Sequence, residues 1–186
     1  MSHLIARRSK SAGFTLAELM IVVVIIGILG TIAVGAYRKH LNSARKTEVY
    51  TMFGEIRAKE EAYRTEFSAY LGTAPNEATF WPTTATANPQ TWNVPGVIPA
   101  PWVQLGVNPG KAQVNCCYHV IAGPANNWGN AGPRGQTFIN SPGNNPPATP
   151  WWYATATCDN DNNAAVNAFL VTSSNNATVF EQNPQR

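Results

Sequence analysis

The sequence predicts an α+β fold in which a long N-terminal helix, membrane-spanning over its first half, packs on a small C-terminal antiparallel β-sheet with long loops. Three observations support this prediction. A predominantly apolar stretch from Phe14 to Ala36 is long enough to cross a bilayer as a helix. A heptad-like apolar stripe follows it. Short strand-like segments between polar, proline-rich stretches then fill the rest of the chain.

A basic leader, residues 1–13, precedes the apolar stretch. No small-x-small cleavage site closes that stretch, so the pattern is not that of an ordinary secretory peptide. The favoured cleavage site lies in front of it, at the Gly13-Phe14 bond. Cleavage there would make residues 14–36 the mature N-terminus and would give Phe14 a free amine about one helical turn from Glu18. The leader cations are Arg7, Arg8 and Lys10, which fit retention of this end in the cytoplasm.

Glu18 is the only acid in the apolar stretch. An ionised side chain in a membrane helix costs roughly 2.5 to 3.5 kcal/mol near the bilayer centre, and such residues usually mark a function and a partner. We therefore expect a positive partner for Glu18. The alternative is a plain single-span anchor in which Glu18 reaches the headgroups. We disfavour it because a plain anchor has no use for this acid, whereas opposite charges attract in a low-dielectric helix bundle.

The Gly13-Phe14 junction, Glu18 at the fifth position after it and the apolar run at residues 19–29 together resemble the N-terminus of type IV prepilins. The resemblance covers about residues 11–37. It implies cleavage after Gly13 by a prepilin peptidase, N-methylation of Phe14, and polymerisation in which Glu18 meets the Phe14 amine of a neighbouring subunit.

The resemblance further implies a structural subunit of a type IV pilus, not an enzyme, in filaments that serve motility, adhesion or DNA uptake. The alternatives are a pseudopilin of a type II secretion system and a pilin-stemmed adhesin or minor tip subunit. The implied partners are copies of the chain and other pilins, the prepilin peptidase and methyltransferase, the inner-membrane assembly platform and, before assembly, the lipid bilayer. The implied location is the bacterial inner membrane for the precursor and then an extracellular pilus or a periplasmic pseudopilus.

Composition gives no support for nucleic-acid binding. Without the leader, Lys plus Arg falls from 13 to 10 and equals the 10 Asp plus Glu. The mature chain is therefore nearly neutral at its side chains, and no basic surface remains to attract a phosphate backbone by charge alone. Neither a catalytic set nor a glycine-rich phosphate loop is evident.

Residues 37–71 continue the helix with an amphipathic pattern. Large apolar residues recur at alternating spacings of four and three, with Glu60 as the one interruption, which predicts a helix to about Tyr70 whose second half is covered by the remaining domain. The apolar members of this stripe are Val49, Phe53, Ile56, Tyr63, Phe67 and Tyr70.

Residues 72–186 are expected to form a loop-rich head. Proline-rich segments at 72–111 and 124–150 predict wrapped loops without a long helix. The strand candidates are residues 113–122, 151–158, 165–172 and 178–182, and short polar turns join the last three as in an antiparallel meander. We expect the six tryptophans to fill the thin core under the loops or joints between subunits, in preference to binding a ligand.

Three cysteines allow one disulfide in an oxidising envelope. Strand alternation puts Cys116 on the more apolar face and Cys117 on the other, so we predict a Cys116–Cys158 disulfide. Closing this loop would stabilise the fold by roughly 4 kcal/mol in the chain-entropy model. Cys117 would then be either buried and inert or a contact between subunits.

A cofactor is not expected, although one candidate metal site is present. Asp159, Asp161 and Asn163 offer oxygen ligands at alternate positions, as calcium loops do. The loop lacks the glycine and the final acid of such a motif, so a polar hairpin in which these side chains bond their own backbone is the favoured alternative.

Overall fold

The computed structural model describes residues 13–83, 85–86, 88–139, 145–159 and 168–182. The chain divides into two compact units, Met1–Leu41 and Asn42–Arg186. Helix α1 (Leu16–Phe67) begins in the first unit and ends in the second. The α+β prediction is confirmed, since this long N-terminal helix is followed by an antiparallel sheet.

The first unit is a bare apolar helix. Between Leu16 and Tyr37, every large apolar side chain that is exposed has at least 45% of its surface accessible. An 18-residue window here has a mean hydropathy of 2.8, and none of it is buried, so α1 is long and apolar enough to cross a membrane. None of the described residues of this unit shields the apolar surface from water.

In the second unit, one face of α1 is buried. Val49, Phe53 and Ile56 have at most 3% of their surface exposed, as the apolar stripe predicts. The prediction is wrong at the end of the stripe. Helix α1 ends at Phe67 and not near Tyr70, and Phe67 is 53% exposed. The adjacent Ser68 has φ 54°, a left-handed conformation that ends a right-handed helix.

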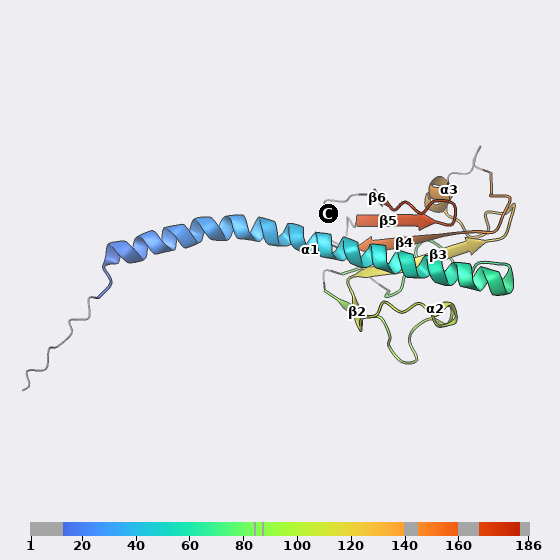
Figure 1. Ribbon diagram of the computed structural model, residues 1–186, viewed down its shortest axis with the longest axis horizontal. Coiled ribbons are helices and arrows are strands. Elements are labelled where there is room, and N and C mark those ends of the chain that lie inside the picture. The colour runs from blue at the N-terminus through green and yellow to red at the C-terminus, as the bar shows by residue number, and fades with distance from the viewer. Residues whose placement is uncertain (1–12, 84, 87, 140–144, 160–167, 183–186) are drawn as a thin grey trace, which may run out of the picture. The chain divides into compact units, whose positions relative to one another are not determined.

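A four-stranded antiparallel sheet packs on this face of α1 (Figure 1). Its order is β3-β4-β5-β6, so each strand pairs with its neighbour in sequence, as expected for a meander. The strands are β3 (Cys116–Gly123), β4 (Trp151–Cys158), β5 (Ala168–Ser173) and β6 (Phe180–Gln182).

The first predicted strand is divided in two. Residues 113 and 114 form β2 (Gln113–Val114), which pairs with β1 (Gln90–Thr91) in a separate two-stranded sheet. Asn115 interrupts the strand because its backbone N–H and its side-chain amide both donate to Glu48 on α1, at 2.8 Å each. The Glu48 carboxylate therefore accepts the backbone hydrogen bond that a neighbouring strand would otherwise accept at this position.

The sheet is buried on both faces, which the sequence pattern did not predict for β3. The helix-facing core includes Tyr118, Val120 and Trp152. On the opposite face, Ile121, Trp151, Tyr153 and Val171 pack with Ala131 and Ile139 from the second loop region. This face also buries His119 and Cys117, although alternation assigned Cys117 to the less apolar side.

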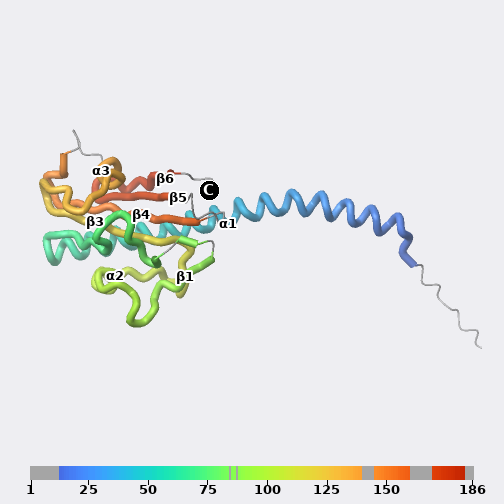
Figure 2. Tube along the Cα trace, turned by 180° about the vertical axis from the view of Figure 1, so that it is seen from behind, coloured from blue at the N-terminus to red at the C-terminus, as the bar shows by residue number. Residues whose placement is uncertain are grey.

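The two predicted loops contain short helices. Helix α2 (Ala100–Leu105) has Pro101 in its first turn and Gly106 at φ 71° as its C-cap, which is the usual placement of both residues. Helix α3 (Pro133–Ile139) lies beside β5 in Figure 2. All the tryptophans except Trp128 are buried, with at most 6% exposed, so they fill the core as expected.

Polar side chains fasten α1 to the head along two sides. Arg57 donates to the Ser173 carbonyl at 2.6 Å and to the Thr172 hydroxyl at 3.1 Å, and its guanidinium lies 5.1 Å from the centre of the Trp152 ring. Lys46 pairs with Glu181 of β6 at 2.6 Å. Because Arg57 and Lys46 hold β5 and β6 respectively, the C-terminal strands have charge-assisted bonds to the helix as well as apolar contacts.

Candidate functional site

Glu18 takes part in a hydrogen-bonded cap at the start of α1. The Thr15 backbone N–H and hydroxyl each donate to Glu18 Oε2 at 2.8 Å, and the Glu18 N–H donates to Thr15 Oγ1 at 3.2 Å. This reciprocal arrangement is a capping box, in which a threonine before the helix and a glutamate three residues later satisfy each other's backbone donors. Such N-caps typically contribute about 1 kcal/mol to helix stability.

The cap fixes where the helix begins. Phe14 and Thr15 lie outside α1. The helix therefore begins two residues later than predicted, because Thr15 adopts the cap position. Phe14 is 80% exposed and follows Gly13 directly. The structure therefore places Gly13 and Phe14 in a non-helical, exposed segment, the kind of segment in which proteolytic cleavage is most often found.

The charge of Glu18 has no cationic partner in the part of the chain that the structure describes. The donors from Thr15 are neutral and reach only Oε2, and the ion pairs among the described residues involve other acids. The carboxylate is exposed among apolar side chains. A cation from outside this segment can therefore approach Oε1 without displacing the Thr15 cap.

The disulfide of the head joins Cys116, the first residue of β3, to Cys158, the last residue of β4. The two residues pair directly across the strands, with their Cα atoms 4.5 Å apart. Cys117 is a free thiol with 1% of its surface exposed. Burial raises the pKa of this thiol to about 12, so it stays protonated at neutral pH and reacts slowly. This corresponds to the buried alternative for Cys117 within a single chain.

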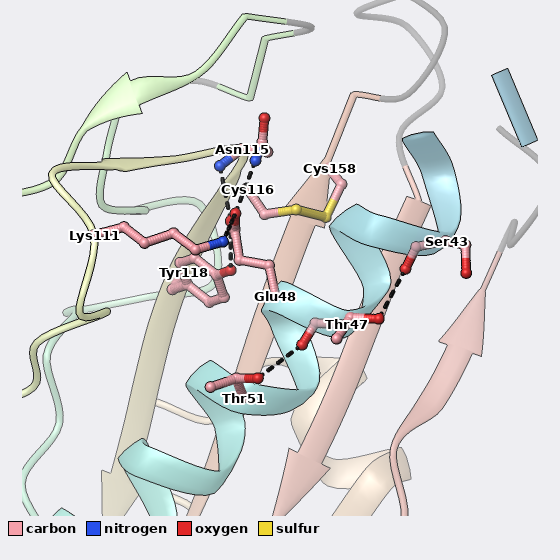
Figure 3. Close-up of polar contacts among 9 residues, drawn as sticks. All are labelled: Ser43, Thr47, Glu48, Thr51, Lys111, Asn115, Cys116, Tyr118 and Cys158. Atoms are coloured by element: carbon pink, nitrogen blue, oxygen red, sulfur yellow. Dashed lines mark hydrogen bonds and ion pairs between the residues drawn. A yellow bond between two sulfur atoms is a disulfide. The ribbon is translucent and has the colours of Figure 1, made fainter. Parts of the chain in front are cut away.

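Glu48 lies beside the disulfide and connects three segments of the head (Figure 3). Its carboxylate receives both Asn115 donors and, at 3.4 Å, the Tyr118 hydroxyl, and Lys111 Nζ lies 4.0 Å away. Its side chain is only 7% exposed. A buried carboxylate with this many donors is costly to remove, so Glu48 has a structural role.

The candidate calcium residues are only partly described. Asp159 is buried, and its backbone carbonyl accepts a bond from Arg45 Nη1 at 2.8 Å. Asp161 and Asn163 lie outside the described residues. Within the described ranges, no group of three His, Cys, Asp or Glu side chains is placed to hold a metal ion.

Comparisons with known proteins agree with the geometry at the helix start. The family model described as the prokaryotic N-terminal methylation motif matches residues 8–34. A probable minor fimbrial protein of Dichelobacter nodosus is 40% identical over 68 residues, which cover 37% of this chain and 43% of the relative. The type IV major fimbrial protein FimA of the same organism is 43% identical over 54 residues, 29% of this chain and 35% of FimA.

The type II secretion system core protein G of Pseudomonas aeruginosa is 32% identical over 93 residues, which cover 50% of this chain and 66% of that protein. The chain belongs to the type IV pilin and pseudopilin family. These three matches span between about a third and two thirds of the relatives' own lengths. No solved structure matches the chain.

Membership of the pilin and pseudopilin family, together with the apolar half of α1, indicates an inner-membrane precursor that later enters a pilus or a pseudopilus. Gly13, Phe14 and Glu18 were predicted from the sequence as candidate residues, but Thr15, which caps the helix with Glu18, was not. The signal was present, because Thr15 and Glu18 have the T-x-x-E spacing of a capping box. Glu48 had no such local signal, since its hydrogen-bond partners Asn115 and Tyr118 are 67 and 70 residues away in sequence.

Proposed function

We propose that the mature chain, cleaved after Gly13 and N-methylated at Phe14, is a structural subunit of a type IV pilus. In this proposal each subunit leaves the membrane by exchanging lipid contacts for contacts between apolar helices. Glu18 of one copy then pairs with the Phe14 amine of a neighbouring copy. The other partners are further pilins, the prepilin peptidase and methyltransferase, and the inner-membrane assembly platform.

The unpaired charge of Glu18 is the observation that carries the proposal. Thr15 satisfies one carboxylate oxygen with neutral donors, and no described cation neutralises the group. A lone carboxylate among apolar helices is costly, whereas a pair of opposite charges in the same surroundings is attractive. Cleavage at Gly13 would create such a cation, the Phe14 amine, on every copy.

A pseudopilin of a type II secretion system is the second candidate. The match to the secretion core protein G covers 93 residues, against 54 residues for FimA. It therefore includes more sequence outside the apolar stretch of residues 14–36. A minor subunit or a pilin-stemmed adhesin is the remaining alternative, in line with the name of the minor fimbrial relative.

Mass analysis of filaments sheared from the cell surface tests the proposal. We expect a subunit that begins at Phe14, carries one added methyl group and is abundant in the filament. A trace amount would favour a minor subunit, and a processed protein absent from surface filaments would favour a pseudopilin. A filament subunit that retains residues 1–13 would contradict the proposal.

A matched pair of variants tests the cleavage site. Gly13→Val should block processing, whereas Gly27→Val should leave it intact. Neither glycine has a neighbouring atom within 4 Å of the position that a Cβ would occupy, so neither change disturbs the isolated chain sterically. Accumulation of the precursor in both variants, or in neither, would count against cleavage at the Gly13-Phe14 bond.

A further inference from the structure

Two cations follow the apolar part of α1 directly. Arg38 and Lys39 come immediately after Tyr37, and the sequence contains no acid between Glu18 and Glu48. Both residues are helical and exposed, and this stretch of α1 is continuous in Figure 1. The helix therefore carries an uncompensated positive charge at the end of its apolar stretch.

The next two cations along the helix are already engaged. Arg45 donates to the Asp159 carbonyl at 2.8 Å, and Lys46 pairs with Glu181 at 2.6 Å. Arg38 and Lys39 differ from them, because no ion pair or hydrogen bond within the described part of the chain involves either residue. None of the described residues supplies their counter-charge.

The length of the apolar helix places these cations at a membrane surface. Arg38 follows Glu18 by 20 residues, which is about 30 Å at 1.5 Å per residue, and the hydrocarbon core of a bilayer is also about 30 Å thick. When Glu18 lies at one interface, Arg38 and Lys39 lie at the other, at the level of the lipid phosphates. Tyr37 is then at the depth that interfacial aromatic residues favour.

Membrane topology alone does not account for Arg38 and Lys39. The leader cations keep the N-terminus in the cytoplasm, so Arg38 and Lys39 would be on the translocated side, where Lys and Arg are normally depleted. Cations on that side act against the usual bias. A binding role at the lipid surface gives a physical reason for their presence.

We propose that Arg38 and Lys39 bind the phosphate groups of anionic phospholipids at the membrane surface opposite the leader, and so fix the depth of the subunit before assembly. The guanidinium can donate two parallel hydrogen bonds to one phosphate, and the ammonium adds a second point charge. This inference rests on the membrane stage of the proposed function, but it requires neither cleavage nor polymerisation.

Native mass spectrometry of the full chain, released from nanodiscs with equal amounts of phosphatidylglycerol and phosphatidylcholine, tests the proposal. In every sample the three leader cations are replaced by glutamine, because they would bind anionic lipid themselves. We expect bound phosphatidylglycerol to exceed phosphatidylcholine. Each cation near an anionic surface contributes about a fivefold preference, so R38Q/K39Q should lower the ratio by about twenty-fivefold.

Lys39→Gln and Lys59→Gln form a matched pair, since both residues are exposed lysines on α1. Lys39→Gln should lower the lipid preference about fivefold, and Lys59→Gln should leave it unchanged. An equal loss in both variants, or no preference in the parent chain, would overturn the proposal. An unchanged lipid ratio together with a lower filament yield in R38Q/K39Q would also overturn it. That result would indicate that Arg38 and Lys39 pair with acids of a neighbouring copy.

Discussion

A Glu60→Gln substitution should stabilise the folded head at neutral pH. Glu60 has no exposed surface. Its Oε2 accepts the Leu71 backbone N–H at 3.0 Å, and its Oε1 has no hydrogen-bond partner. Burial raises the pKa of this carboxyl from 4.5 to about 8, and the Leu71 bond only partly opposes the shift. Glutamine keeps the acceptor for Leu71 and carries no charge at any pH.

The sign and size of the Glu60 effect follow from proton linkage. Between pH 4.5 and 8 the unfolded chain has released the Glu60 proton while the folded chain retains it, so the free energy of unfolding falls as pH rises. The slope is about 1.4 kcal/mol per pH unit. At pH 7 Glu60 therefore costs about 3 kcal/mol relative to pH 4, and Glu60→Gln should recover most of this amount.

Urea unfolding of the full chain in a neutral detergent, without reductant, measures the effect. The six tryptophans lie between Trp81 and Trp152, so their fluorescence reports on the head. The difference in unfolding free energy between Glu60→Gln and the parent should be near zero at pH 4 and about 3 kcal/mol at pH 7. The matched control is Glu66→Gln, because Glu66 is an exposed glutamate of the same helix and does not contribute to the Glu60 shift. A difference that does not change with pH would refute the reasoning.

Two further predictions concern the sheet. Burial, and to a smaller extent Arg134, lowers the pKa of His119 from 6.5 to about 3. The free energy of unfolding should therefore fall by about 1.4 kcal/mol per pH unit as pH drops from 6.5 towards 3. His119→Phe should flatten this slope in urea unfolding, and an unchanged slope would count against a buried neutral imidazole. Replacing both Cys116 and Cys158 with serine opens a loop with a sequence separation of 42 and should lower the unfolding free energy by about 4 kcal/mol. Cys117→Ala should cost far less. Equal losses in the two variants would show that packing, not the covalent link, accounts for the effect.

Periodic features of the sequence predicted much of the fold. The spacing of Val49, Phe53 and Ile56 identified the buried face of α1, because an amphipathic helix repeats every three to four residues. Alternation in β3 separated Cys116 from Cys117, since neighbouring side chains in a strand point to opposite faces. The structure has both features.

Features that depend on distant parts of the chain were not predicted. Glu48 interrupts the strand at Asn115, although the two residues are 67 positions apart. The second core needs Ala131 and Ile139 from a loop region to cover β4, and proline-rich sequence gives no periodic sign of such packing. At the candidate site, the Thr15 cap could have been recognised from its local spacing. That no described cation lies near Glu18 could be seen only in the structure.

Filament yield after Glu18→Ala tests the central claim most directly. The claim predicts that surface filaments are lost while the subunit remains in the membrane at its normal level, because the Phe14 amine of each neighbour has no acid to meet. Thr15→Ala is the matched control: it removes the two hydrogen bonds that the Thr15 hydroxyl makes with Glu18, at about 1 kcal/mol, but keeps the backbone bond to the carboxylate and the charge, so filaments should still form. Wild-type yield from Glu18→Ala would contradict the account.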